Sequence, residues 1–127
     1  AQAVAEFLDA PDQVENVQFA GLPSSPWYER TQEYGGGRGA GSIVAFDVKG
    51  GVDAGKRFVE GCVLHSHVAN IGDVRSLVIH PASTTHSQLS PEEQVQSGVG
   101  PGLIRLSVGL ETLSDIIADL ETAFAAV

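Results

Sequence analysis

Arg105 is the residue whose type and surroundings most clearly suggest chemistry. It lies within the apolar segment 103–108, whose residues would alternate between the two faces of a β-strand. The alternation places Ile104 and Leu106 on one face and Arg105 on the other. A lone arginine usually points into water, but its planar guanidinium is also suited to binding a carboxylate at the floor of a pocket. The spacing alone leaves both interpretations open.

The four histidines are a second source of chemistry. His65 and His67 are two residues apart, so on a strand they would share a face and present two ring nitrogens to a metal ion. No aspartate or glutamate is well placed by sequence to supply a third ligand. Paired histidines more often pack or form hydrogen bonds, so we expect no metal site and keep a metal-binding module as the alternative.

Nucleophilic catalysis and phosphate binding find little support. Cys62 falls on the inward face of a predicted helix and is expected to be a buried core thiol. No serine lies in a Gly-x-Ser-x-Gly turn. The glycine-rich run 35–41 follows a predicted helix and precedes a predicted strand, which is the reverse of the order in a phosphate-binding loop. We therefore expect no catalytic residue in this chain and interpret the glycine run as a connector.

The composition limits the classes of molecule that the protein is expected to bind. The 127 residues suit one domain, residues 1–127. Sixteen acidic against seven basic residues give a net charge of −9, which argues against nucleic acid or an anionic membrane as partner. The single cysteine rules out an internal disulfide and fits a cytoplasmic setting. The lack of methionine and the start inside a predicted helix indicate a fragment of a longer protein.

The segment from Leu64 to His86 contains the elements that would position these residues. A turn is expected at 70–73, a buried strand at 76–80, and an end to the strand at Pro81, which has no N–H to donate. The polar run 83–86 follows, either as the edge of a site or as a plain surface loop.

The remaining segments predict an α+β fold. Strands are expected at 14–19, 42–46 and 103–108, and helices at 1–9, 27–34, 54–62, 91–97 and 113–124. Expected helix caps are Ser25, Gly35, Asp53, Ser90 with Glu93, and Thr112 with Asp115. The last helix would bury Leu113, Ile116, Ile117, Leu120 and Phe124. We expect an α/β sandwich in which helices cover one side of a small, largely antiparallel sheet of about four strands.

Three segments together, 64–73, 76–86 and 103–111, resemble the C-terminal domain of the Cys/Met-metabolism family of pyridoxal-phosphate enzymes. Residues 21–26 and 90–98 also fit the O-acetylhomoserine sulfhydrylase branch of that family. The resemblance runs over nearly the whole chain and rests on long, ordered motifs.

This resemblance implies the small domain of a fold-type-I enzyme, usually a homotetramer that uses pyridoxal 5'-phosphate. The reaction implied is replacement of the acetate of O-acetyl-L-homoserine by sulfide, which yields homocysteine for methionine biosynthesis. The partners implied are therefore small molecules. The alternatives are a fragment of a related methionine gamma-lyase or cystathionine gamma-synthase, or a non-enzymatic metal-binding or interaction module.

The resemblance also implies roles for individual residues. Arg105 matches the family arginine that binds the substrate α-carboxylate, and Asn70 matches a neighbour at the same carboxylate, where related lyases tend to have serine. The run 83–86 would line the edge of that pocket without a catalytic role. The family binds its cofactor through a lysine in a Ser-x-x-Lys segment, which neither Lys49 nor Lys56 matches, so the fragment alone is expected to be inactive.

Overall fold

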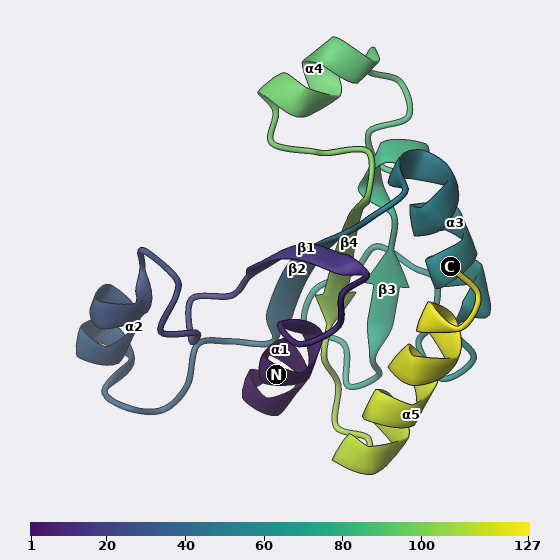
Figure 1. Cartoon of the computed structure of the whole chain (residues 1–127). Helices are drawn as coiled ribbons and strands as arrows, with labels where there is room; N and C mark the ends of the chain where they lie inside the picture. The colour runs from purple at the N-terminus through teal and green to yellow at the C-terminus, as the bar shows by residue number, and fades with distance from the viewer.

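Helices and strands alternate along the chain (Figure 1). The structure is a computed structural model that describes all 127 residues. In order, the elements are α1 (Gln2–Leu8), β1 (Val14–Gln18), α2 (Tyr28–Gly35), β2 (Ile43–Val48), α3 (Gly51–Gly61), β3 (Leu77–Ile79), the 3-10 helix η1 (Pro81–Ser83), α4 (Pro91–Gln96), β4 (Leu103–Ser107) and α5 (Leu113–Phe124). None of these helices has the length and apolar character needed to cross a membrane.

The four strands form one sheet in the order β1-β2-β4-β3, and each neighbouring pair is antiparallel. Strand β4 is therefore central, with β2 on one side and β3 on the other. Ala45 of β2 and Ile79 of β3 both lie opposite Arg105 in the register. The architecture confirms the predicted α+β fold with a small antiparallel sheet.

One face of the sheet forms the core, because alternate residues of the strands point to the same side. Val44, Phe46, Ile104 and Leu106 are fully buried there. Helices α1, α3 and α5 cover this face and contribute most of the remaining buried apolar residues. The ring of Phe58 packs against two others, with centroids 5.4 Å from Phe46 and 4.8 Å from Phe124.

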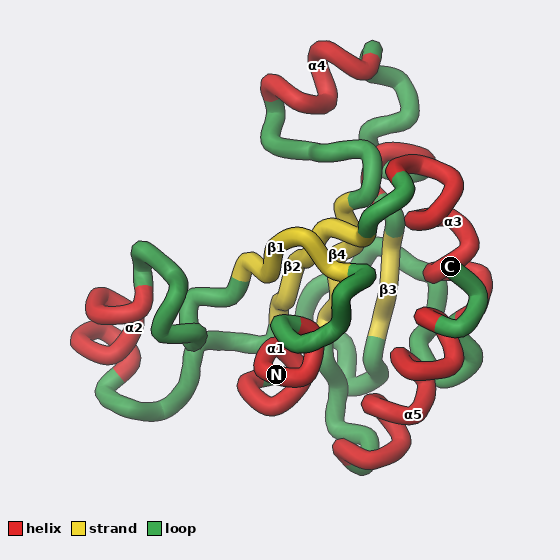
Figure 2. Tube along the Cα trace, viewed as in Figure 1, coloured by secondary structure: helices red, strands yellow, loops and turns green.

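Two helices stand away from this core. Helices α2 and α4 contain no buried residue, and each projects from the sheet at the end of long loops (Figure 2). Helix α2 exposes large side chains, among them Tyr34. The core is therefore built by three of the five α-helices, all on one side of the sheet.

Some expected helix ends are confirmed and others are wrong. Ser90 and Glu93 form the predicted reciprocal capping box, with bonds of 2.8 and 3.3 Å. Thr112 caps α5 by position, but its side chain makes no capping bond, so the expected pairing with Asp115 is absent. Leu113 is 48% exposed and lies outside the buried stripe of α5.

Two further expected helix ends are wrong, and a glycine determines the observed end in each case. Helix α3 begins at Gly51 after Gly50, whose φ of 102° lets the chain turn tightly, so Asp53 lies in the first turn and is not the cap. Helix α2 ends at the left-handed Gly36, one residue beyond the expected Gly35, and Ser25 accepts a bond from the Trp27 N–H without being its N-cap.

Replacing Phe58 with alanine is expected to lower the free energy of unfolding of the chain by about 3–5 kcal/mol, because it removes a buried ring that packs against Phe46 and Phe124 and leaves a cavity. Tyr34→Ala is the matched control, since that ring is 79% exposed and its loss should change stability by less than about 0.5 kcal/mol. Urea unfolding measures both values, and equal effects of the two substitutions would contradict the assigned core.

Candidate functional site

Arg105 occupies the middle of the inner strand β4, on the sheet face opposite the core helices, where Leu103 packs in a smaller apolar cluster with Ala82 and Val99. Its neighbours Ile104 and Leu106 are buried in the core, as the alternation predicts. Ala45 and Ile79 flank Arg105 across the sheet, so the floor around the arginine is small and apolar. The side chain is half-buried, and the other six basic residues of the chain are all exposed.

The guanidinium has very few partners for a half-buried charge. Its Nη2 donates one hydrogen bond to the backbone carbonyl of Asn70, at 3.2 Å. Its Nε has no partner at all. No carboxylate of the chain forms an ion pair with it. Buried arginine is normally paired with an anion, so this arginine has donors available for an acceptor from elsewhere.

The structure brings together the two residues predicted to bind the carboxylate, Arg105 and Asn70. The contact uses the main chain of Asn70, because its side-chain oxygen accepts a bond from the Ile71 N–H at 2.9 Å. The loop that carries Asn70 is exposed, and Asp73 bonds the Arg75 N–H within it. The carbonyl thus orients the guanidinium without neutralising it.

The chain by itself does not close a pocket around this pair. Its largest cavity, about 600 Å³, is lined by residues such as Asp9, Asn16 and Trp27, and neither Arg105 nor Asn70 borders any cavity of the chain. Arg105 as the floor of a pocket therefore stays a prediction.

The polar side chains at and after the end of β3 form hydrogen bonds within the chain. The buried His80 has its Nδ1 within 2.8 Å of the Ser83 hydroxyl and donates from Nε2 to the Pro101 carbonyl at 2.7 Å. Thr84 donates its hydroxyl to the His80 carbonyl at 2.8 Å. Gly55 makes room for this imidazole, because a Cβ there would lie 2.5 Å from the ring. The histidine thereby fixes the path of the chain beyond β3.

His65 and His67 do not form the pair that their spacing suggested. Only Ser66 of this stretch makes a bridge, so no strand places the two rings on one face. His67 is exposed, whereas His65 is buried and its Nδ1–H donates to Asp119 Oδ2 at 2.6 Å. Because a carboxylate only accepts, this bond places the ring proton on Nδ1.

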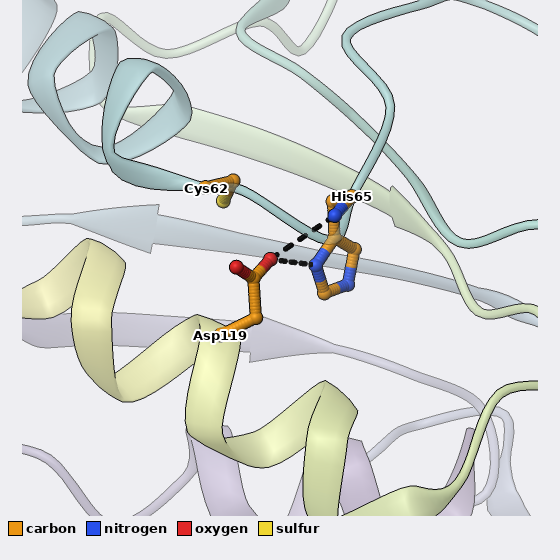
Figure 3. Close-up of side chains that lie close together, drawn as sticks. All are labelled: Cys62, His65 and Asp119. Carbon is orange, nitrogen blue, oxygen red and sulfur yellow. Dashed lines mark hydrogen bonds and ion pairs between the residues drawn. The ribbon is translucent and has the colours of Figure 1, made fainter.

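Cys62, His65 and Asp119 do come together, with one ligand atom of each within 4.8 Å of the others (Figure 3). The lone pairs of Asp119 are already used, because its two oxygens accept the backbone N–H groups of Val63, Leu64 and His65 as well as the imidazole proton. A metal ion would have to displace these bonds. The cluster is therefore better suited to holding the chain than to binding a metal.

The thiol in this cluster is held in its protonated form. Burial and the nearby Asp119 carboxylate raise the pKa of Cys62 to about 12. Its Sγ donates instead to the Phe58 carbonyl, at 3.6 Å. The expected position inside the helix is wrong, because α3 ends at Gly61 and Cys62 follows it as the C-cap; the side chain is half-buried and packs against the edge of the core.

Asp119 has several hydrogen-bond partners, and the sequence did not predict this role. Burial by itself would raise the pKa of this carboxyl, but the hydrogen bonds from the His65 ring and from the Leu64, Val63 and His65 N–H groups hold the pKa below its usual value. The sequence feature that could have indicated this role is the position of Asp119 between Ile116 and Leu120, on the apolar side of α5. An acid in that position is buried and needs partners.

We expect stability at acidic pH to depend on Asp119. Its pKa is lower in the folded chain than the usual 3.8, so its stabilising effect is complete above that pH and is lost as pH falls through the folded value. Asp119→Asn should therefore weaken the acid dependence of the unfolding free energy. The control is Asp115→Asn, at an exposed position on the same helix, and urea titrations between about pH 2 and 5 compare them. Equal acid dependence in wild type and Asp119→Asn would refute the assignment.

Comparison with known proteins places this geometry in context. The family model for Cys/Met metabolism PLP-dependent enzymes matches residues 1–125. O-acetyl-L-homoserine sulfhydrylase from Corynebacterium glutamicum is 54% identical over 124 residues, which are 98% of this chain and 28% of that protein. L-methionine gamma-lyase from Porphyromonas gingivalis is 50% identical over 121 residues, which are 95% of this chain and 30% of that protein.

A solved structure agrees over the same extent. The crystal structure of a Campylobacter jejuni protein assigned as an O-acetylhomoserine (thiol)-lyase, which contains a pyridoxyl-lysine, matches 98% of this chain and 30% of its own with a TM-score of 0.90 and 38% identity. The chain thus spans less than a third of the length of each of these relatives. From the family match and these identities, the chain belongs to the Cys/Met metabolism PLP-dependent enzymes.

Proposed function

We propose that this chain is the C-terminal small domain, residues 1–127, of a longer cytoplasmic and homotetrameric O-acetylhomoserine sulfhydrylase. That enzyme makes homocysteine from O-acetyl-L-homoserine and sulfide, and this domain binds the substrate carboxylate. The observation that carries the proposal is the half-buried Arg105 guanidinium, which has no carboxylate partner in a chain with a net charge of −9. The 54% identity to the Corynebacterium glutamicum sulfhydrylase supports the reaction.

Arg105 suits this role because of its geometry and its environment. A guanidinium presents N–H groups in a plane and can donate two parallel bonds to one carboxylate. Nη2 is aligned by the Asn70 carbonyl, and the apolar Ala45 and Ile79 beside the strand lower the local dielectric. Both factors strengthen binding of an α-carboxylate at this place and fix the orientation of the amino acid.

The chain does not supply the residue that holds the cofactor. Lys49 and Lys56 are its only lysines, and both are exposed on the surface. A lysine that reacts with a carbonyl at neutral pH needs a lowered pKa, which burial provides. Pyridoxal phosphate supplies the electron withdrawal that makes the bound amino acid reactive. In our proposal its lysine belongs to the remaining polypeptide, and this domain contributes binding and orientation only.

A methionine gamma-lyase is the second candidate, because the Porphyromonas gingivalis enzyme of that name is 50% identical. Asn70 favours the sulfhydrylase, since the resemblance associates serine at this position with the lyases. The two activities are separated by supplying the longer enzyme with O-acetyl-L-homoserine and sulfide or with methionine. Homocysteine formation from the first pair supports our proposal, and cleavage of methionine without it would support the lyase.

Removal of the guanidinium in the longer enzyme should weaken amino-acid binding. We expect Arg105→Ala to cost about 2–5 kcal/mol of binding free energy, because the carboxylate of the substrate would lose its charged partner. Arg105→Lys should recover part of this loss, since an ammonium keeps the charge but cannot donate two bonds in one plane. The KM for O-acetyl-L-homoserine measures both variants.

Arg57→Ala provides the matched control, because it removes an exposed arginine from α3 and changes the net charge equally. Its KM should equal that of the wild type. If Arg105→Ala also left KM unchanged, the carboxylate-binding role would be wrong.

A further inference from the structure

The position of the Arg105 guanidinium depends on one loop. Residues 66–75 connect the segment after α3 to strand β3, and they carry the Asn70 carbonyl that is the only hydrogen-bond partner of this guanidinium. The loop is closed at its base, because the Ser66 N–H donates to the Ser76 carbonyl at 2.9 Å. Whatever holds the two ends of this loop therefore also places the Asn70 carbonyl.

Asp119 holds the first end of the loop (Figure 3). Its Oδ1 accepts the N–H groups of Val63 and Leu64 at 2.7 and 2.9 Å. Its Oδ2 accepts the N–H of His65 at 3.1 Å and the ring proton of the same residue at 2.6 Å. One carboxylate on α5 thus fixes three consecutive backbone N–H groups immediately before Ser66, and its bonds to the buried His65 lie where such bonds are strong.

Glu111 holds the other end. Its two oxygens accept the Ser76 N–H at 2.7 Å and the Ser76 hydroxyl at 2.8 Å. The same hydroxyl oxygen accepts the Gly109 N–H at 2.9 Å, and the Leu110 N–H donates to the Val74 carbonyl at 2.9 Å. The backbones approach so closely that a Cβ at Gly109 would lie 2.4 Å from the Ser76 nitrogen.

We propose that Asp119 and Glu111 are positioning residues for substrate binding, which act by holding both ends of the loop that sets the Arg105 guanidinium. The inference rests on the proposed role of Arg105 in binding the substrate carboxylate. Neither acid touches the guanidinium, so each acts through Asn70. The two carboxylates accept bonds from backbone N–H groups, a hydroxyl and an imidazole, and neither pairs with a lysine or an arginine, so they fix geometry while leaving the arginine unpaired.

The test uses Asp119→Asn and Glu111→Gln in the longer enzyme with its cofactor bound. Each amide keeps the shape of the acid but turns one acceptor into a donor that faces an N–H or O–H group. We expect the KM for O-acetyl-L-homoserine to rise about tenfold, with a much smaller change in kcat. Asp115→Asn and Glu121→Gln are matched controls at exposed positions of α5, and they should leave both constants unchanged.

Hydrogen exchange separates positioning from general destabilisation. In both test variants the backbone N–H groups of residues 66–76 should exchange faster, while those of β2 and β4 should keep their wild-type rates. In an Arg105→Lys background, Glu111→Gln should add much less to KM than it does alone, because both changes act on the same contact. Gly109→Ala, which disturbs the same loop end without changing a charge, should also raise KM.

The outcomes distinguish this inference from the function it rests on. If Arg105→Ala raises KM but Asp119→Asn and Glu111→Gln do not, the positioning role is wrong and the carboxylate-binding role stands. If Arg105→Ala leaves KM unchanged, both are wrong. Should Asp119→Asn fail to fold, Glu111→Gln and Gly109→Ala decide the question, and a wild-type KM in both would overturn the proposal.

Discussion

Strand β4 must satisfy opposite demands on its two faces, and the rest of the structure follows from this constraint. Ile104 and Leu106 on one face complete the core beneath α1, α3 and α5. Arg105 between them projects to the other face, where only the backbone of Asn70 contacts its guanidinium. A shift of one residue in the register would bury the cation and expose both apolar side chains. The core therefore fixes where the charge is presented.

Part of this could be predicted from the alternation of side chains along a strand, although Leu103 and Ser107 on the face of Arg105 are also buried. The alternation of residues 103–108 placed Arg105 on the correct face, and the Ser90 and Glu93 spacing predicted a capping box that the structure contains. Thr112 had the same pattern with Asp115 but makes no capping bond. The spacing of two residues shows only that a capping hydrogen bond between them is possible. The direction in which the chain enters the helix decides whether that bond forms.

The contacts that position Arg105 could not be predicted from local sequence patterns, for a different reason. Asp119 is 54 residues from His65 along the chain, and three of its four hydrogen bonds go to backbone N–H groups, which every non-proline residue has. No residue type therefore marks the partners. The same holds for Asn70, whose backbone carbonyl makes the contact with Arg105 while its side chain bonds the next N–H. The resemblance to a family identified Asn70, but the spacing of residues did not show how it acts.

The hydrogen-bond partners of the two acids explain why Arg105 remains unpaired in a strongly acidic chain. A carboxylate near Arg105 would pair with it and compete with any incoming anion. Asp119 and Glu111 instead direct their oxygens to N–H and O–H groups, and the hydrogen bonds lower the pKa of both acids despite the cost of burial. Their negative charge is therefore stabilised by hydrogen bonds and by His65, without a lysine or an arginine. The positive charge on β4 remains unneutralised, and an unneutralised charge on an apolar floor binds an anion more strongly than one already paired.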